Sequence, residues 1–215
     1  MRGEPPLNSA QFDRLLVRLA VDIVDAAVFR RLHRDLLGSE EEFSREFAQS
    51  QAFWSLSLRA YIEAALYRLI RVYVGHNAAH SLGRWLDAIK RNPQLFSTPP
   101  DPDQLTKDIE FVKTGAVVKK LTGLRGNFVA HINWSNIADD VRVGHRFDLS
   151  FQEIDQLVSR AMEILNRYGN LFKRTSWSPS IVGHDDYQTI LKALRHDLER
   201  WDAERVAERE PAKKS

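Results

Sequence analysis

Cysteine is absent from the 215-residue sequence. Its absence excludes disulfide bonds, thiolate metal sites and cysteine nucleophiles. No stretch of 18 apolar residues occurs, and residues 1–8 contain no apolar run typical of a signal peptide. We therefore expect a cytoplasmic protein that does not cross or bind a membrane.

The sequence also has no large excess of charge of one sign. Lys and Arg number 31, Asp and Glu number 29, and the formal net charge is +2. A globally basic nucleic-acid-binding protein is not indicated, so any contact with RNA or DNA would depend on a local basic patch. With 43% hydrophobic and 28% charged residues, the composition is typical of a globular protein that can bury a core.

Apolar residues recur at three- and four-residue spacing through most of the chain, which is the pattern of amphipathic helices. The spacing predicts six helical segments, over residues 9–38, 39–74, 82–92, 104–131, 151–171 and 187–207. Residues 50–74 are apolar on most faces, which predicts the central and most buried helix. Only residues 141–143 resemble a strand, and we find no internal repeat. The predicted fold is an all-α bundle of about six helices.

Residues that favour helix starts precede most of these segments. The predicted caps are Ser9, Ser81, the pair Asp185–Asp186, and two capping boxes, Ser39 with Glu42 and Ser150 with Glu153. We expect three parts: a bundle over residues 9–175, a C-terminal helix over 176–207 that packs on the same domain, and a frayed tail over 208–215.

An arginine and a histidine lie six positions apart near the end of the segment 104–131. At 100° per residue, Arg125 and His131 are about 120° apart around an ideal helix, and they could converge if the helix bends or ends between them. Gly123 and Gly126 are where such a bend would be least costly. An arginine beside a histidine that titrates near neutrality suits phosphate chemistry. The spacing alone leaves open a surface arginine and a helix-end histidine.

The sequence Leu-Arg-Gly-Asn-Phe-Val-Ala-His-Ile-Asn at residues 124–133 resembles the HEPN superfamily (higher eukaryotes and prokaryotes nucleotide-binding). The signature of that superfamily is an arginine, four to six residues, and a histidine. The more specific resemblance is to the abortive-infection AbiU-type branch, often written Leu-Arg-Asn-Lys-x-x-Ala-His. An acidic-capped helix after His184 is similar as well, so the resemblance spans most of residues 10–200.

This resemblance implies a helical bundle that dimerises and brings two such motifs to one cleft. It also implies a metal-independent endoribonuclease of a toxin or antiviral system, without a cofactor. His131 would transfer protons, Arg125 would stabilise phosphate charge, and Asn127 and Asn133 would contact the substrate. The implied partners are RNA, a second copy and an antitoxin. Because some HEPN proteins have lost catalysis, the alternative to an endoribonuclease is a non-catalytic nucleotide-binding, RNA-binding or interaction module.

Two positions depart from the pattern of the branch. Gly126 stands where a polar residue commonly follows the arginine, and Asn127 differs from that position by about 100° around the helix. Asn133 stands where a related toxin subgroup has a tyrosine that a partner enzyme modifies. We therefore do not expect that mode of neutralisation here.

Other candidate sites have simpler explanations. His76 and His80 have the spacing of two metal ligands, but they lie in a predicted turn without a third ligand, which favours a solvated pair. The run of residues 184–186 could bind a cation, although helix capping explains its two carboxylates. Trp134 could stack on a base, but we favour a role in the core.

Two groups of charged residues each have two interpretations. On the apolar segment, Arg59, Arg68 and Arg71 are either paired, as Arg59 with Glu63, or line the active cleft. The second group is either a basic rim around the motif or a dispersed solvated face, and it comprises Lys113, Lys119, Lys120, Arg125, Arg142 and Arg146.

Overall fold

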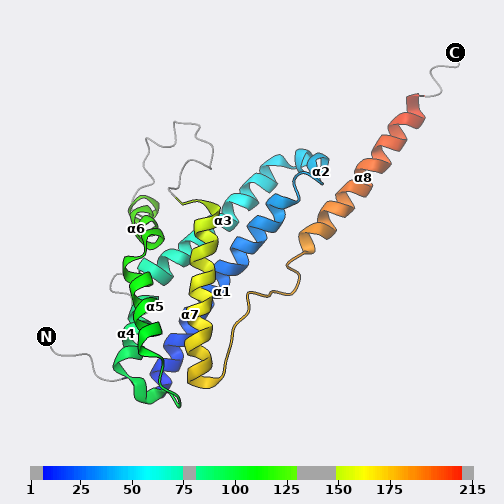
Figure 1. Ribbon diagram of the computed structural model, residues 1–215. Coiled ribbons are helices and arrows are strands. Elements are labelled where there is room, and N and C mark those ends of the chain that lie inside the picture. The colour runs from blue at the N-terminus through cyan, green and yellow to red at the C-terminus, as the bar shows by residue number, and fades with distance from the viewer. Residues whose placement is uncertain (1–6, 75–80, 130–148, 210–215) are drawn as a thin grey trace. The chain divides into compact units, whose positions relative to one another are not determined.

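The computed structural model describes residues 7–74, 81–129 and 149–209, with the side chains of α6 described as far as Leu124 (Figure 1). Every regular element in these ranges is helical, which confirms the predicted all-α fold. The elements are α1 (Ser9–Gly38), α2 (Ser44–Gln49), α3 (Gln51–Val74), α4 (Leu82–Arg91), the 3₁₀ helix η1 (Pro93–Leu95), α5 (Pro102–Thr114), α6 (Ala116–Val129), α7 (Phe151–Lys173) and α8 (Asp186–Arg209). The strand candidate at residues 141–143 lies outside the described ranges. Among the described helices, none is both long and apolar enough to cross a membrane.

The contacts divide the chain into two compact units. Unit 1 comprises Met1–Arg30 and Glu63–Pro179, and unit 2 comprises Arg31–Ile62 and Ser180–Ser215. Helices α1 and α3 contribute residues to both units. Within unit 2, α8 contacts α2. The predicted division into a bundle over residues 9–175, a C-terminal helix over 176–207 on the same domain, and a tail over 208–215 stays a prediction.

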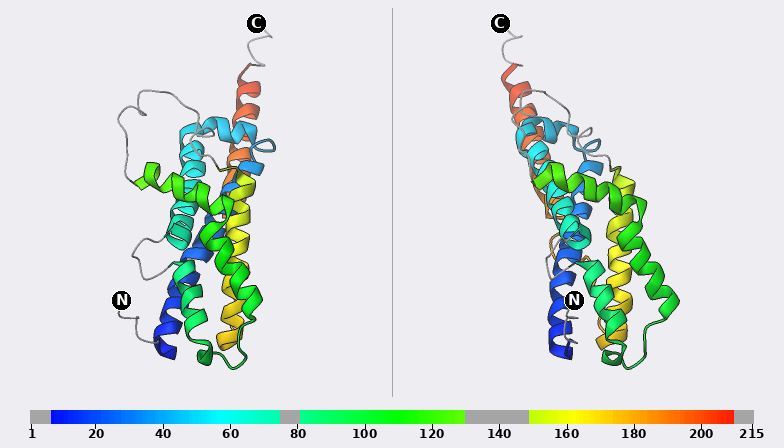
Figure 2. Two further views of the ribbon diagram at one scale, coloured as in Figure 1. Left: turned by 60° about the vertical axis from the view of Figure 1, so that its left-hand side comes forward. Right: turned by 90° about the vertical axis from the view of Figure 1, so that its left-hand side faces the viewer.

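Unit 1 holds the larger core. The first part of α1 runs roughly side by side with α4, α5 and α7 in both views of Figure 2. The aromatic ring of Phe12 lies at the centre of one cluster, 5.9 Å from Trp85, 5.6 Å from Phe96 and 4.7 Å from Phe172. Fully buried apolar side chains continue the core, among them Leu16, Leu19, Ile23, Leu66, Leu69, Leu82, Leu86, Ile89, Leu121 and Ile154. Each such side chain stabilises the fold by about 1.5–3 kcal/mol.

The predicted cap of α1 was wrong by one residue. The side chain of Asn8 accepts a hydrogen bond from the backbone N–H of Gln11 at 2.9 Å, and the Gln11 side chain accepts one from the Asn8 N–H at 3.0 Å. Ser9 is therefore the first helical residue and Asn8 is the cap. An amide pair three residues apart satisfies the same two backbone donors as a Ser–Glu box.

The predicted capping box of Ser39 and Glu42 was also wrong. The Ser39 hydroxyl instead donates to the backbone carbonyl of Asp35 at 2.9 Å, and residues 39–43 form turns. Helix α2 begins only after Phe43, which provides no side-chain cap. A serine directly after a helix can satisfy the carbonyls of that helix, so the same residue type also suits a helix end.

The other two predicted serine caps are confirmed. Ser81 accepts a hydrogen bond from the backbone N–H of Arg84 at 3.4 Å at the start of α4. Ser150 and Glu153 form a complete capping box at the start of α7, with hydrogen bonds of 3.2 and 2.8 Å. The loop before α8 turns at Gly183, whose φ of 77° favours glycine.

The predicted segment 104–131 is two helices that meet at Gly115. This residue has φ −53° and ψ 136°, and its N–H donates to the carbonyl oxygen of Phe111 to close α5. A Cβ at this position would lie 2.5 Å from that oxygen, so only glycine fits the close approach. Figure 2 shows α6 turned away from the direction of α5. The predicted segment 39–74 is likewise divided into α2 and α3.

The prediction that residues 50–74 form the most buried helix holds for only part of α3. Ile62, Leu66 and Leu69 are buried, but Phe53 and Leu56 in the first half are 58% and 63% exposed. The first half belongs to unit 2, which has fewer elements to cover an apolar helix. Apolar composition therefore overestimated how completely the helix is enclosed.

A buried carboxylate ties α5 to α7. Asp108 has no exposed surface, and its oxygens lie 2.6 Å from a guanidinium nitrogen of Arg160 and 2.5 Å from one of Arg167. The Tyr168 hydroxyl donates to the same carboxylate at 2.8 Å, and the Gln104 amide donates at 3.0 Å. Four donors from two helices thus meet on one side chain.

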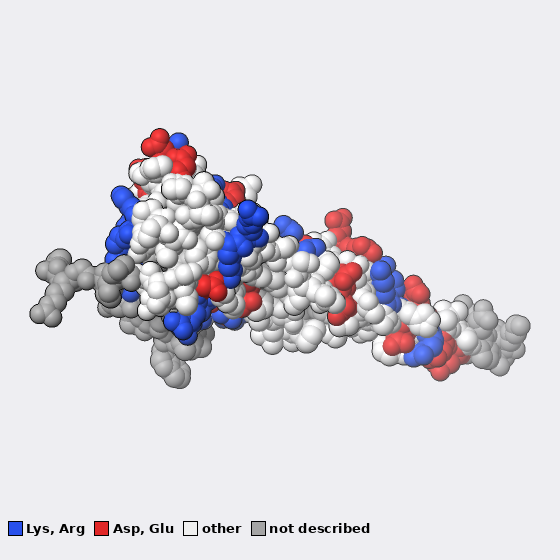
Figure 3. Space-filling view, turned by 90° about the horizontal axis from the view of Figure 1, so that it is seen from below, with Lys and Arg blue, Asp and Glu red and all other residues white. Residues whose placement is uncertain are grey.

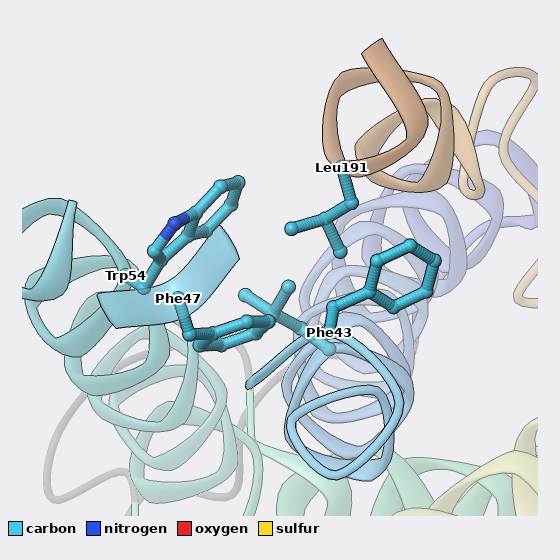
Figure 4. Close-up of a cluster of buried hydrophobic side chains, with 5 residues drawn as sticks. Phe43, Phe47, Trp54 and Leu191 are labelled. Carbon is cyan, nitrogen blue, oxygen red and sulfur yellow. The ribbon is translucent and has the colours of Figure 1, made fainter. Parts of the chain in front are cut away.

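Unit 2 has a smaller core of its own. Figure 4 shows Phe43, Phe47, Trp54 and Leu191 packed together, and Leu36 completes this cluster. Each of the five is buried.

An ion pair joins α2 to α8 beside this cluster. The guanidinium of Arg195 donates to the carboxylate of Glu46 at 2.8 Å and to the carbonyl oxygen of Glu42 at 2.6 Å. Its carbon lies 4.2 Å from the centroid of the Phe43 ring. Glu46 is buried, whereas the side chain of Arg195 is 37% exposed, so only the carboxylate side of the pair is shielded from water.

Glu46→Gln is expected to make unit 2 less stable at neutral pH but not in acid. Burial alone would raise the pKa of Glu46, but hydrogen bonds from Arg195 and from its own backbone N–H hold it below the usual value. A lowered folded-state pKa stabilises the fold above the unfolded-state value of about 4.3, and the contribution is lost as pH falls through the folded-state pKa. The variant should lose about 1 kcal/mol at pH 7.

Urea unfolding followed by circular dichroism at pH 7 and pH 3 measures this difference. Glu41→Gln, at an exposed position of the turn that precedes α2, is the matched control and should change little at either pH. If Glu46→Gln lowers the free energy of unfolding as much at pH 3 as at pH 7, the pair of Glu46 and Arg195 does not stabilise the fold through charge.

Candidate active site

Helix α6 carries the arginine of the motif and packs on the bundle through one face. Val118, Leu121 and Leu124 are 4%, 0% and 7% exposed, and α6 contacts α5 and α7. Position 125 is about 40° from position 121 around the helix, whereas position 127 is about 120° from it. The backbone position of Arg125 is therefore on the packed face, and that of Asn127 is not.

An ion pair links α6 to the start of α7. The ammonium of Lys120 lies 2.6 Å from a carboxylate oxygen of Glu153. The hydrogen bond from Lys120, followed by that from the Ser150 backbone N–H, holds the pKa of Glu153 below its usual value. The segment that contains His131 and Asn133 follows α6 and leads to Leu149, which is buried. The two helices that flank this segment, α6 and α7, are therefore joined to each other by the pair Lys120–Glu153.

Two of the four predicted site residues lie on a described helix. Arg125 and Asn127 belong to α6, whereas His131 and Asn133 lie outside the described residues. The convergence of Arg125 and His131 stays a prediction. Helix α6 runs through Gly123 and Gly126 to Val129, so its helical structure is not interrupted at either glycine.

Sequence reasoning missed a buried arginine of α1 that contacts the start of α7. Arg30 is 6% exposed, and its guanidinium lies 2.8 and 2.9 Å from the two carboxylate oxygens of Asp155. Its carbon also lies 5.0 Å from the centroid of the Phe151 ring. No local pattern identifies a pair 125 residues apart in sequence. The pair fixes the first turn of α7 to α1, so it supports the helix that follows the motif segment.

The charged residues of the second half of α3 are paired with α1. Arg68 contacts Asp22 at 2.6 Å and Asp25 at 2.9 Å, and Arg71 contacts Asp22 at 3.2 Å. Asp22 is buried, so its charge needs these partners. For these two arginines, the structure favours pairing over the lining of a cleft.

Two members of the predicted basic rim are also paired. Lys113 contacts Asp87 at 2.9 Å, and Lys120 contacts Glu153. Lys119 is exposed on α6, and Arg142 and Arg146 lie outside the described residues. Figure 3 shows Lys and Arg interspersed with Asp and Glu on the face that it displays. For the two paired lysines, the dispersed face is the better description.

A basic hollow on α4 was not predicted. Arg84, Asp87, Lys90 and Arg91 line an open space of about 430 Å³ in unit 1. Three cations and one carboxylate make the lining positive. The residues are spaced by three and four along one helix, which is a signal that the sequence contained.

No group of three or more His, Asp or Glu side chains that could hold a metal ion occurs among residues 7–74, 81–129 and 149–209. His76 and His80 lie outside these ranges, as does Trp134.

An all-α chain with an Arg-x5-His motif that begins on a packed helix has the features of an HEPN protein. The family model described as AbiU2, an HEPN family, matches residues 9–200. The chain therefore belongs to the AbiU2 family of HEPN proteins, which confirms the resemblance seen in the motif. No curated protein and no solved structure matches it. Membership of this family indicates an abortive-infection role of the HEPN type.

Proposed function

We propose that the protein is a metal-independent endoribonuclease of an abortive-infection system and that it cleaves RNA through Arg125 and His131. One observation carries this proposal: position 125 is on the packed face of α6, within a chain that the AbiU2 family model matches over residues 9–200. A charged group on an anchored helix is well placed to act on a fixed phosphate.

The reaction uses the 2′-hydroxyl of the RNA as its nucleophile. This hydroxyl loses its proton to a base, its oxygen bonds to the adjacent phosphorus, and the bond from phosphorus to the 5′-oxygen breaks. The leaving oxygen takes a proton, so the products are a 2′,3′-cyclic phosphate and a 5′-hydroxyl. His131 transfers protons, and Arg125 stabilises the negative charge that develops on the phosphate. Asn127 and Asn133 contact the substrate.

A second copy completes this proposed site. Two Arg125–His131 pairs at one cleft would supply two histidines, one to accept the proton of the 2′-hydroxyl and one to donate a proton to the leaving 5′-oxygen. A single histidine would have to do both. The proposed dimer has the segment 125–131 in the shared cleft, and an antitoxin is its proposed inhibitor. Light scattering at micromolar concentration should give the mass of two chains.

Two described features support the proposal. The contact of Lys120 with Glu153 and the burial of Leu121 hold α6, which carries Arg125, in place beside α7. The hollow on α4 adds a positive surface in the same unit, and phosphate groups favour such surfaces.

Induced expression tests the proposal in cells. Wild-type protein should stop growth and degrade total RNA, whereas His131→Ala should do neither. His196→Ala, at an exposed histidine of α8, is the matched control and should behave as wild type. Equal RNA loss with His131→Ala would overturn the proposal. Inactive protein that binds RNA tightly and in a salt-sensitive way would favour the binding module, an outcome consistent with Gly126 in place of the usual polar residue.

A further inference from the structure

Unit 2 contains a groove of about 290 Å³ between α2 and the first half of α3. Its lining comes from the preceding turn and from both helices, and it comprises Glu40, Ser44, Phe47, Ala48, Gln51, Trp54, Ser55 and Leu58. Phe47 and Trp54 also belong to the buried cluster in Figure 4, so the floor of the groove is fixed by the core of the unit.

The spacing of the lining residues suits a helical ligand. Helix α2 contributes positions 44, 47 and 48, and α3 contributes positions 51, 54, 55 and 58. Each set lies at three- and four-residue spacing, so each helix presents one continuous face to the groove. Two such faces form a trough into which a third helix can lay its apolar side. The volume is at the lower end for small-molecule pockets and suits anchoring side chains.

The floor of the groove is aromatic. The rings of Phe47 and Trp54 are stacked with centroids 5.2 Å apart, and Phe53, which contacts Trp54 at 4.9 Å, is 58% exposed. The indole nitrogen of Trp54 is buried without a hydrogen-bond partner among the described residues. A buried donor without an acceptor costs about 1–3 kcal/mol, so this part of the core is less stable than a fully paired one would be.

The charge of the groove lining is negative. Glu40 is its one charged residue, and no Lys, Arg or His is among the lining residues. Glu41, the next residue in the sequence, is exposed. On α2, the guanidinium of Arg45 lies 2.6 Å from a carboxylate oxygen of Asp202 and is not part of the lining. A carboxylate beside an aromatic floor is complementary to a ligand that carries cations beside an apolar stripe.

We propose that this groove docks an amphipathic helix of a partner protein, with bulky apolar side chains on the aromatic floor and Lys or Arg beside Glu40. The proposed docking site lies in unit 2 and uses neither Arg125 nor His131. It is therefore independent of whether the protein cleaves RNA.

Two synthetic 18-residue helical peptides test the proposal on the full chain. Both carry leucine at three- and four-residue spacing, and their remaining positions are mostly Lys in one and mostly Glu in the other. Titration followed by fluorescence polarisation should show that the Lys peptide binds at least ten times more tightly than the Glu peptide. Glu40→Lys should reverse or remove this preference.

Ala48→Arg and Ala60→Arg form a matched pair of variants. Both alanines are exposed on helices of unit 2, but only Ala48 lines the groove. Ala48→Arg should weaken binding of the Lys peptide at least tenfold, and Ala60→Arg should leave it unchanged. Circular dichroism checks that both variants keep the helical content of the wild type.

Three results would overturn the proposal. One is equal affinity of the Lys peptide for both alanine variants, and another is equal affinity of the two peptides for the wild type. The third is a change of oligomeric state with Ala48→Arg alone, because it would make the groove an interface between copies of this chain. RNA cleavage by Ala48→Arg at the wild-type rate would show that loss of docking and loss of catalysis are separate.

Discussion

Asp108→Ala is expected to lower the free energy of unfolding by about 3–5 kcal/mol, because it removes one partner from a buried ion-pair network. The carboxylate has no exposed surface and receives hydrogen bonds from Arg160, Arg167, Tyr168 and Gln104. Without it, two guanidinium groups repel each other at the α5–α7 interface.

The two arginines and the tyrosine differ in how far water can compensate for the loss. The side chains of Arg160 and Arg167 are 24% and 31% exposed, so partial hydration should keep the effect near the lower end of this range. Tyr168 is fully buried, and its burial together with its hydrogen bond to Asp108 raises the pKa of the phenol. The hydroxyl therefore stays protonated at neutral pH and would be left without this acceptor.

Urea unfolding at pH 7, followed by circular dichroism, measures the loss. Asp108→Asn keeps the shape but removes the charge, so it should fall between wild type and Asp108→Ala. Asp87→Ala is the matched control, because its partner Lys113 is also on α5 but both side chains are partly exposed. That control should cost less than about 1 kcal/mol. Equal losses for the Asp108→Ala and Asp87→Ala variants would contradict the network as a stabilising element.

Arg125→Ala is expected to reduce the rate of RNA cleavage about 100-fold or more, as loss of a preorganised charge stabiliser typically does. His131→Ala should abolish cleavage, because it removes the group that moves protons. Arg125→Lys should retain part of the rate, since an ammonium keeps the charge but not the two-pronged geometry of a guanidinium. The substrate should be single-stranded RNA, with a 2′,3′-cyclic phosphate product, and DNA should be resistant.

Single-turnover cleavage of a labelled RNA measures these rates, with product termini identified by mass spectrometry. Lys107→Ala, at an exposed position of α5, is the matched control and should change the rate less than tenfold. Cleavage should persist in the presence of a chelator. Cleavage that needs a divalent cation, or that survives both substitutions in the motif, would rule out the proposed mechanism.

The sequence by itself determined the features that depend on near neighbours. Apolar spacing predicted which segments are helical, though not the breaks within residues 39–74 and 104–131. Ser81 and Ser150 predicted two of the helix starts, because a cap involves groups within about three residues of one another. The Arg125–His131 motif predicted the HEPN family, which the match over residues 9–200 confirms. Local patterns are informative where the interacting groups lie close together in the chain, but Ser39 shows that the same residue type can end one helix instead of starting the next.

Only the tertiary structure decided the features that depend on distant neighbours. Three of the four donors to Asp108, the side chains of Arg160, Arg167 and Tyr168, lie 52 to 60 positions away, and no spacing in the sequence marks them. The exposure of Phe53 and Leu56 depends on how many elements surround α3, not on the composition of that helix. At Gly115 the chain changes direction, and the close approach of the Phe111 carbonyl there leaves no space for a Cβ. Burial and ion pairing are properties of packed surfaces, so they are established only when separate helices meet.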